Sequence, residues 1–331
     1  MLKNVYCHIK MKILYSNLSL KEDDKKMNKF AIVTDSTSDL TPEIRKARNI
    51  DYARMMVSWT DVKDKKQHEI FASLDWEVYS QHEYFNLLRD GNRLITSQVT
   101  EQEFDRVFGQ YLDKGMDVLY VSCSSALSAS VHLAERLAKE KYSKKYPNQK
   151  VVCVDSLIAC FGEGLVALAA ADLRDAGKSI EDTAAWLNEH KLEYNQIATV
   201  ESLEYLKRAG RVKASKAFFG NIFGVKPMLI SDAIGNNFAF EKQKGRRNAL
   251  IRVATFVKEN VINPEEQVCY VSQADASQED VKLLVDKIKE LIPEFKAVEV
   301  IPLGPIIGAT TGPGTMAAFF RGKKVTVVGD N

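Results

Sequence analysis

Apolar runs of strand length alternate with helical patterns along the first part of the chain. The runs are FAIVTD, MMVSW, RLITS, DVLYVSC and VVCVDS, and the segments between them place apolar residues at helical spacing. Thr41-Pro42 marks one helix start, and Thr100 with Glu103 three residues later marks another. Continuous apolar strands that alternate with helices predict a parallel sheet with helices on both faces.

The pattern changes after about residue 190. Six further strand candidates follow, interleaved with helical patterns over 245–260 and 277–290: QIATVES, VKPMLIS, NFAFEK, QVCYVSQ, AVEVIPL and KVTVV. NFAFEK comes directly after the turn Ile-Gly-Asn-Asn, which predicts an antiparallel hairpin and therefore a mixed sheet. In the first part, the charged segment 61–69 predicts an exposed hairpin or loop. We therefore predict an α/β chain with a disordered extension over 1–27, a parallel-sheet domain over 28–190 and a mixed-sheet domain over 191–331.

Composition limits the classes of partner. The 331 residues contain 46 Lys and Arg against 44 Asp and Glu, so a net charge of +2 gives no electrostatic reason to expect a nucleic-acid or membrane-surface binder. No segment reaches the roughly 18 apolar residues of a membrane span. The five cysteines are odd in number and lack CxxC spacing, which favours buried reduced thiols and a cytoplasmic location.

Hydroxyl-rich clusters follow four of the predicted strands, at 35–38, at 96–98, at 122–125 with Ser128, and at 155–156. The carboxyl ends of parallel strands open to one side of a sheet, where ligands bind. Four such clusters predict a rim of hydrogen-bond donors suited to an anionic head group. Each cluster taken alone is also explained as the cap of the next helix.

Familiar cofactor motifs do not fit. The pattern G-x-G-x-x-A at Gly162, Gly164 and Ala167 begins seven residues after Asp155, too far for the tight turn of a dinucleotide site. A GxxxxGK[ST] phosphate loop is absent, the histidines lack metal-ligand spacing, and none lies beyond His190. We therefore expect neither a cofactor nor a metal.

Two motifs in the second part offer ligand contacts. YLKRAGRVKAS places Arg211 directly after a glycine, which suits recognition of a carboxylate or phosphate, although a solvated basic loop explains it equally. IIGATTGPGT offers the hydroxyls of Thr310 and Thr311 beside glycines that let the backbone approach a ligand. Its alternative explanation is an ordinary glycine turn before a helix over AAFF.

Seven collinear stretches resemble the DegV family of fatty-acid-binding proteins and span residues 30 to 320: AIVTDSTSDL, ITSQVT, VSCSSALSAS, VVCVDSLIACFGEGLV, YLKRAGRVKA, FGVKPML and IIGATTGPGT. The resemblance implies two α/β domains that hold one long-chain fatty acid between them, with the carboxylate at the mouth. It also implies a partner, because bacterial members present that carboxylate to a separate fatty-acid kinase, which phosphorylates it with ATP.

The resemblance also assigns residues. Ser97 matches the serine of the T-S-Q-P motif, and Ser58 or Thr60 stands near the second-strand threonine that contacts the carboxylate. Arg211 matches the arginine of the G-G-R motif, with Ala209 in place of the first glycine. The resulting set of ligand-binding candidates is Ser97, Thr96, Thr60, Ser58, Ser125, Thr310, Thr311 and Arg211.

One position departs from the family pattern. Thr310 stands where the family has a histidine before T-G-P-G, which bears on the kinase-coupled role rather than on fatty-acid binding. Candidates for the apolar lining of the cavity, which serve equally as ordinary core, are Phe218, Phe219, Ile222, Phe223, Met228, Leu229, Phe238 and Phe240.

The resulting hypothesis is a lipid-binding carrier that is not an enzyme on its own. One alternative is a small-molecule kinase or phosphotransfer enzyme of a related fold, against which the missing nucleotide loop and the lack of histidines beyond residue 190 argue. Another is a lipid-sensing regulatory protein, which the sequence does not separate from a carrier.

Overall fold

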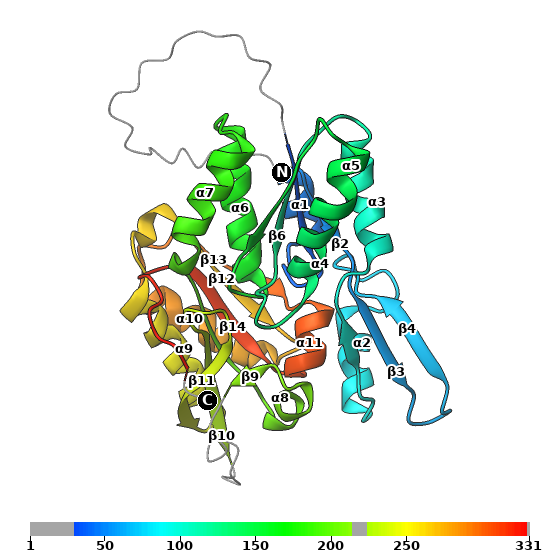
Figure 1. Cartoon of the computed structure of the whole chain (residues 1–331). Helices are drawn as coiled ribbons and strands as arrows, with labels where there is room; N and C mark the ends of the chain where they lie inside the picture. The colour runs from blue at the N-terminus through cyan, green and yellow to red at the C-terminus, as the bar shows by residue number, and fades with distance from the viewer. Residues whose placement is uncertain (1–29, 214–223, 330–331) are drawn as a thin grey trace, which may run out of the picture.

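A four-stranded parallel sheet forms the first part of the molecule (Figure 1). The structure is a computed structural model that describes residues 30–213 and 224–329. In sheet order, the strands are β2 (Ile50–Ala53), β1 (Ala31–Asp35), β6 (Val118–Ser122) and β7 (Val151–Asp155). Helices α3 (Glu101–Leu112) and α4 (Ser130–Leu137) lie on one side of it, and α6 (Phe161–Asp175) and α7 (Ile180–His190) on the other. The parallel sheet with helices on both faces is thus confirmed.

The two predicted helix starts are also confirmed. The side chain of Thr41 accepts a hydrogen bond from the N–H of Ile44 at the start of α1 (Pro42–Arg48). The side chain of Thr100 accepts one from the N–H of Glu103 at the start of α3. Each cap satisfies a backbone donor that has no partner within the helix.

A separate three-stranded antiparallel sheet extends from this part. In sheet order it contains β4 (Gln67–Phe71), β3 (Met56–Thr60) and β5 (Ile95–Ser97). The charged segment 61–69 is the predicted hairpin, since it joins β3 to β4. The predicted strands MMVSW and RLITS belong here rather than to the parallel sheet, because β3 and β5 pair antiparallel with each other, and β5 follows α2 (Gln81–Arg89).

The second part is built on a seven-stranded mixed sheet. In sheet order it contains β13 (Ala297–Pro302), β12 (Val268–Gln273), β14 (Met316–Arg321), β8 (Tyr194–Thr199), β10 (Val225–Ser231), β11 (Asn237–Lys244) and β9 (Val212–Lys213). The predicted hairpin is confirmed, since β10 and β11 pair antiparallel, and β12 pairs parallel with β13. Helices α9 (Arg246–Asn260) and α10 (Gln278–Leu291) pack together on this sheet.

Three expectations about the second part are wrong. The helix expected over AAFF is the strand β14, which pairs with both β12 and β8 and is buried, so tertiary pairing overrides the helix propensity of alanine. The segment expected to be a glycine loop contains the short helix α11 (Pro305–Thr311), which has proline at its first position. The run KVTVV forms no strand, because its backbone bonds to Leu192 and Ala233 are isolated.

Helix α6 packs between the two large sheets. It contacts β1 of the first sheet and both β8 and β14 of the second. The ring of Phe161 at its start lies 4.3 Å from the ring of Tyr270 and 6.4 Å from that of Phe319, measured between centroids. The chain passes from the first sheet to the second between α7 and β8, close to the boundary predicted at residue 190. One apolar core nevertheless contains residues from both parts.

Some expectations fall on residues that the structure does not describe. The predicted extension over 1–27 lies outside the described residues, and so do Phe218, Phe219, Ile222 and Phe223. Within the described ranges, none of the helices combines the length and the apolar character that crossing a bilayer requires.

Candidate ligand-binding site

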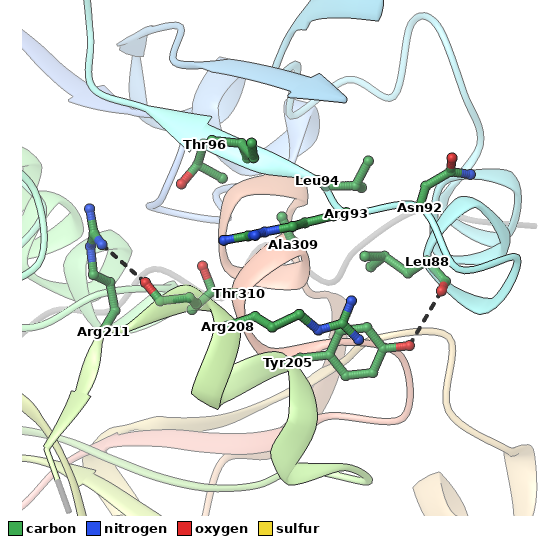
Figure 2. A pocket seen from close by; sticks show the side chains of 12 residues that line it. Leu88, Asn92, Arg93, Leu94, Thr96, Tyr205, Arg208, Arg211, Ala309 and Thr310 are labelled. Atoms are coloured by element: carbon green, nitrogen blue, oxygen red, sulfur yellow. Dashed lines mark hydrogen bonds between the residues drawn. The ribbon is translucent and has the colours of Figure 1, made fainter. Parts of the chain in front are cut away.

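A cavity of about 180 Å³ lies where α2 and β5 meet α8 (Leu203–Ala209) and α11 (Figure 2). Its volume is below the roughly 300–1,000 Å³ of typical small-molecule sites, so it accommodates a head group rather than a whole long-chain lipid. The residues that line it are Leu88, Asn92, Arg93, Leu94, Ile95, Thr96, Tyr205, Arg208, Ala209, Arg211, Ala309 and Thr310.

The short helix α11 contributes one wall because it packs closely on α2. A Cβ atom on Gly308 would lie 2.7 Å from Cζ of Phe85, so only glycine permits this approach. The hydroxyl of Tyr84 donates a hydrogen bond of 2.8 Å to the carbonyl oxygen of Pro305 and holds the start of the helix. Ala309 and Thr310 then line the cavity.

Arg211 reaches the cavity from the end of α8. Gly210 ends that helix in the left-handed region, with φ of 65°, and the chain turns there before β9. Nη1 of Arg211 donates to the carbonyl oxygen of Ala209 at 3.0 Å, and Nε donates to that of Leu127 at 3.4 Å. The glycine turn therefore directs an exposed guanidinium group, and the short strand β9 follows it.

Tyr205 lies on α8 and joins the two parts of the wall. Its hydroxyl donates a hydrogen bond to the carbonyl oxygen of Leu88 on α2, at 3.5 Å (Figure 2). Arg208 lies over the Tyr205 ring, 5.2 Å from its centroid, and forms an ion pair of 2.8 Å with Glu204. Burial raises the pKa of Tyr205, so its hydroxyl stays a donor at neutral pH.

Three of the motifs singled out in the sequence meet beside this cavity. The N–H of Val99, next to the T-S-Q segment, donates to the hydroxyl oxygen of Ser130 at 3.1 Å. The hydroxyl of Ser130 lies 2.9 Å from that of Ser128 in the S-S-x-L-S segment. Arg211 binds the same segment through the carbonyl oxygen of Leu127. Segments far apart in sequence thus converge on one place.

The structure brings three of the eight candidate residues to the cavity: Thr96, Thr310 and Arg211 line it. Neighbouring residues of a strand point to opposite faces, and of the two β5 hydroxyl residues Thr96 lines the cavity whereas Ser97 does not. Ser58 is paired with Ile95 in the register and therefore shares the face of Ser97.

The remaining candidates lie elsewhere. Thr60 pairs with Gln67 beyond the end of β5. Thr311 is buried, and its hydroxyl donates to the carbonyl oxygen of Ile307. Ser125 uses its N–H to bind Asp155 at 3.1 Å and does not line the cavity.

The expected rim of four hydroxyl clusters forms only in part: the clusters that follow β1, β6 and β7 meet through backbone bonds to Asp35 and Asp155, but they do not line the cavity. The cluster over 35–38 is buried, and its hydrogen bonds are internal: Tyr120 donates to Asp35 at 2.8 Å, and the Thr37 hydroxyl contacts the carboxyl groups of both Asp35 and Glu163. Burial raises the pKa of both carboxyl groups. Only the cluster on β5 lies at the cavity, because that strand belongs to the other sheet.

Asp39 lies close to this buried network. It is 3% exposed, and its Oδ2 atom lies 2.6 Å from the thiol sulfur of Cys160. Burial raises the pKa of Asp39 to about 7. The first hydroxyl cluster is therefore part of a buried polar core rather than of an open site.

Sequence reasoning missed Arg93, Arg208 and Tyr205 as residues of the cavity. Arg93 was not singled out from the strand RLITS, and Arg208 was considered only as part of a basic loop. The apolar candidates Met228 and Leu229 are buried in the core, and Phe238 and Phe240 pack against it, so none of the four lines this cavity.

Comparison with known proteins agrees with the seven motifs. The family model described as "Uncharacterised protein, DegV family" matches residues 29–323. A DegV domain-containing protein of Clostridium perfringens is 34% identical over 296 residues, which are 89% of this chain and 98% of that protein. A DegV domain-containing protein of Streptococcus pyogenes is 28% identical over 295 residues, with the same coverage of both chains.

Solved structures agree as well. A DegV family protein from Thermus thermophilus, described for its fatty acid binding, aligns with a TM-score of 0.73 and 26% identity, over 88% of this chain and 98% of that chain. DegV from Bacillus subtilis, described as a fatty acid binding protein, aligns with a TM-score of 0.72 and 25% identity over the same shares. The predicted resemblance is confirmed, and the chain belongs to the DegV family.

Proposed function

We propose that this protein binds one long-chain fatty acid and holds its carboxylate in the cavity between α2, β5, α8 and α11. The observation that carries the proposal is the convergence of Thr96, Thr310 and Arg211 on one cavity from three separate motifs. The fatty acid binding described for the relatives from Thermus thermophilus and Bacillus subtilis supports it.

The hydrocarbon chain supplies most of the binding free energy. Burying about 14 methylenes at roughly 0.8 kcal/mol each contributes on the order of 11 kcal/mol. That is enough for micromolar or tighter affinity after the costs of association. The tail needs room beyond the 180 Å³ of the cavity, so the walls around it separate when the lipid binds. Hydroxyl and guanidinium groups then set which end of the lipid faces outward.

The bound acid is the substrate of a separate cytoplasmic kinase, and this chain acts as a carrier rather than as an enzyme by itself. In that reaction a carboxylate oxygen attacks the terminal phosphorus of ATP, the bond to ADP breaks, and ADP leaves with the electron pair. Arg211 is exposed and binds only backbone carbonyl groups in the described residues, so its charge is available to the transferred group. Thr310 supplies no charge because its hydroxyl is neutral, and that hydroxyl donates to the carbonyl oxygen of Ile306.

Native mass spectrometry of the purified full chain, together with lipid extraction, tests the binding step. We expect one fatty acid per chain, and a delipidated sample should take up added hexadecanoate with a stoichiometry of one. An empty protein that also ignores added fatty acid would refute the proposal. Phosphate transfer to the bound acid with a kinase from the same organism tests the second step separately.

A further inference from the structure

Three arginine side chains approach the same cavity from different segments. Arg93 comes from the loop between α2 and β5, Arg208 from α8, and Arg211 from the turn after α8 (Figure 2). None of the residues that line the cavity is acidic. Such a concentration of like charge in one small space is unfavourable unless an anion occupies it.

The protein itself neutralises only part of this charge. Arg208 forms an ion pair with Glu204, whose side chain is 69% exposed. Arg211 donates to two carbonyl groups, which leaves its formal charge in place. Arg93 is exposed, and among residues 30–213 and 224–329 its guanidinium group has neither a hydrogen bond nor an ion pair. Among the described residues, two positive charges therefore remain uncompensated at the cavity.

A fatty-acid carboxylate carries a single negative charge, which offsets only one of these two positive charges. A phosphoryl group carries about −1.5 to −2 charges at neutral pH and offers three acceptor oxygens. The planar fork of arginine also suits phosphate oxygens, which it binds in pairs. The charge of the site thus matches a phosphorylated head group better than a free acid.

We infer that the cavity holds a phosphorylated lipid head group in preference to the free carboxylate, and that Arg93 sets this preference. The inference rests on the proposed function. We assign this role to Arg93 because its guanidinium group has no partner among the described residues. Arg93 also approaches from the side of the cavity opposite Arg208 and Arg211. A phosphoryl group in the cavity would lie between Arg93 on one side and Arg208 and Arg211 on the other. The protein would therefore bind the phosphorylated lipid more tightly than the free fatty acid.

Calorimetric titration of the delipidated full chain tests this with three probes: hexadecanoate, hexadecyl phosphate as a stable phosphorylated lipid, and inorganic phosphate. We expect hexadecyl phosphate to bind at least about tenfold more tightly than hexadecanoate, as one additional charge-assisted hydrogen bond would give. Arg93→Gln should remove most of that difference and change hexadecanoate affinity by less than about threefold. Raising the salt concentration should also reduce the difference, since the site is partly open.

Two further variants complete the design. Arg93→Lys keeps the charge and should restore part of the preference. Arg136→Gln removes an equal charge from an exposed position on α4 away from the cavity and should leave the preference unchanged. Equal losses for hexadecanoate and hexadecyl phosphate in Arg93→Gln would overturn the role of Arg93.

The probes separate the sources of the phosphate group. Inorganic phosphate that binds as tightly as hexadecyl phosphate would overturn the lipid part of the inference in favour of a free-phosphate site. A chain that binds hexadecanoate but shows no preference for hexadecyl phosphate would refute the inference and leave the proposed function standing. A chain that binds neither lipid would refute both.

Discussion

The hydroxyl of Tyr205 donates a hydrogen bond to the carbonyl oxygen of Leu88, 3.5 Å away, and so connects α8 with α2 across the wall of the cavity. This distance is at the upper limit for a hydrogen bond. The contact is therefore weak, and under the proposed function we expect the wall to open there when a lipid binds.

Removing this hydroxyl should loosen the wall without unfolding the protein. We expect Tyr205→Phe to change the free energy of unfolding by less than about 1 kcal/mol, because the bond is long and the site partly solvated. Release of a fluorescent fatty acid, followed by stopped-flow displacement, should become faster by about two- to fivefold. Tyr79→Phe is the control, since Tyr79 does not line the cavity. An unchanged release rate would mean that the wall opens elsewhere.

The two hydroxyls of β5 face opposite sides, so their removal should have different effects. Thr96 lines the cavity, and we expect Thr96→Val to weaken fatty-acid binding by up to about 1.5–3 kcal/mol, less where water replaces the hydroxyl. The family resemblance instead favours Ser97 as the carboxylate ligand, so Ser97→Ala is the matched comparison. Titration of both variants decides which face of β5 holds the carboxylate, and a loss only in Ser97→Ala would contradict the assignment of Thr96.

Arg211 should matter more for phosphate transfer than for binding. Its guanidinium group is held by the carbonyl oxygens of Leu127 and Ala209, so it can face a developing phosphoryl charge without gripping the carboxylate. We expect Arg211→Ala to reduce kinase-dependent acyl-phosphate formation at least about tenfold and fatty-acid affinity less than about threefold. Arg211→Lys should retain part of the transfer. Equal losses in both assays would make Arg211 a simple binding residue.

The buried carboxyl of Asp39 should make stability depend on pH. Its pKa rises from 3.8 to about 7 in the folded chain because of burial, so the folded state binds the proton more tightly than the unfolded state. This contribution to stability is complete below about pH 4 and is lost as the pH rises through 7. Relative to the wild type, Asp39→Asn should therefore gain stability as the pH rises from 5 to 8.

Asp275→Asn offers a matched control for that measurement. Asp39 and Asp275 both have a left-handed backbone, with φ of 52° and 50°, a conformation that asparagine tolerates. Burial opposes ionisation of Asp275, but the hydrogen bonds from Arg89 and His82 outweigh it and lower the pKa. Because histidine loses its charge in this range, the comparison is made in a His82→Gln background. There, urea unfolding should show a difference with and without Asp275→Asn that is flat between pH 5 and 8. A flat difference for Asp39→Asn as well would show that its carboxyl does not titrate in this range and would contradict the prediction.

The strands and helices that carry strong periodic patterns could be predicted from the sequence. DVLYVSC forms a strand buried on both faces, VVCVDS forms the partly buried edge strand beside it, and Thr41 and Thr100 cap helices through local hydrogen bonds. MAAFFR could not be predicted, because its alanines favour a helix and only pairing with β8 and β12 makes it a strand. The local sequence does not indicate which distant strands a segment will pair with.

The candidate site was only partly predictable for a similar reason. Arg211 stands out because a glycine fixes its direction, whereas Arg93 gains its place only when α2 and β5 meet α8 and α11. The hydroxyl cluster at 35–38 was misjudged, since sequence spacing does not reveal that Glu163 and Tyr120 bury and bind it. Burial of a polar group depends on partners distant in the chain.

Helix α6 has a consequence for how the molecule melts. Because it contacts β1 on one side and β8 and β14 on the other, a fragment ending at residue 190 would leave Phe161 without Tyr270 and Phe319. A fragment starting at 191 would expose the other face of the same contact. The two parts are thus expected to unfold in a single cooperative transition, and neither is a module that evolution could exchange independently of the other.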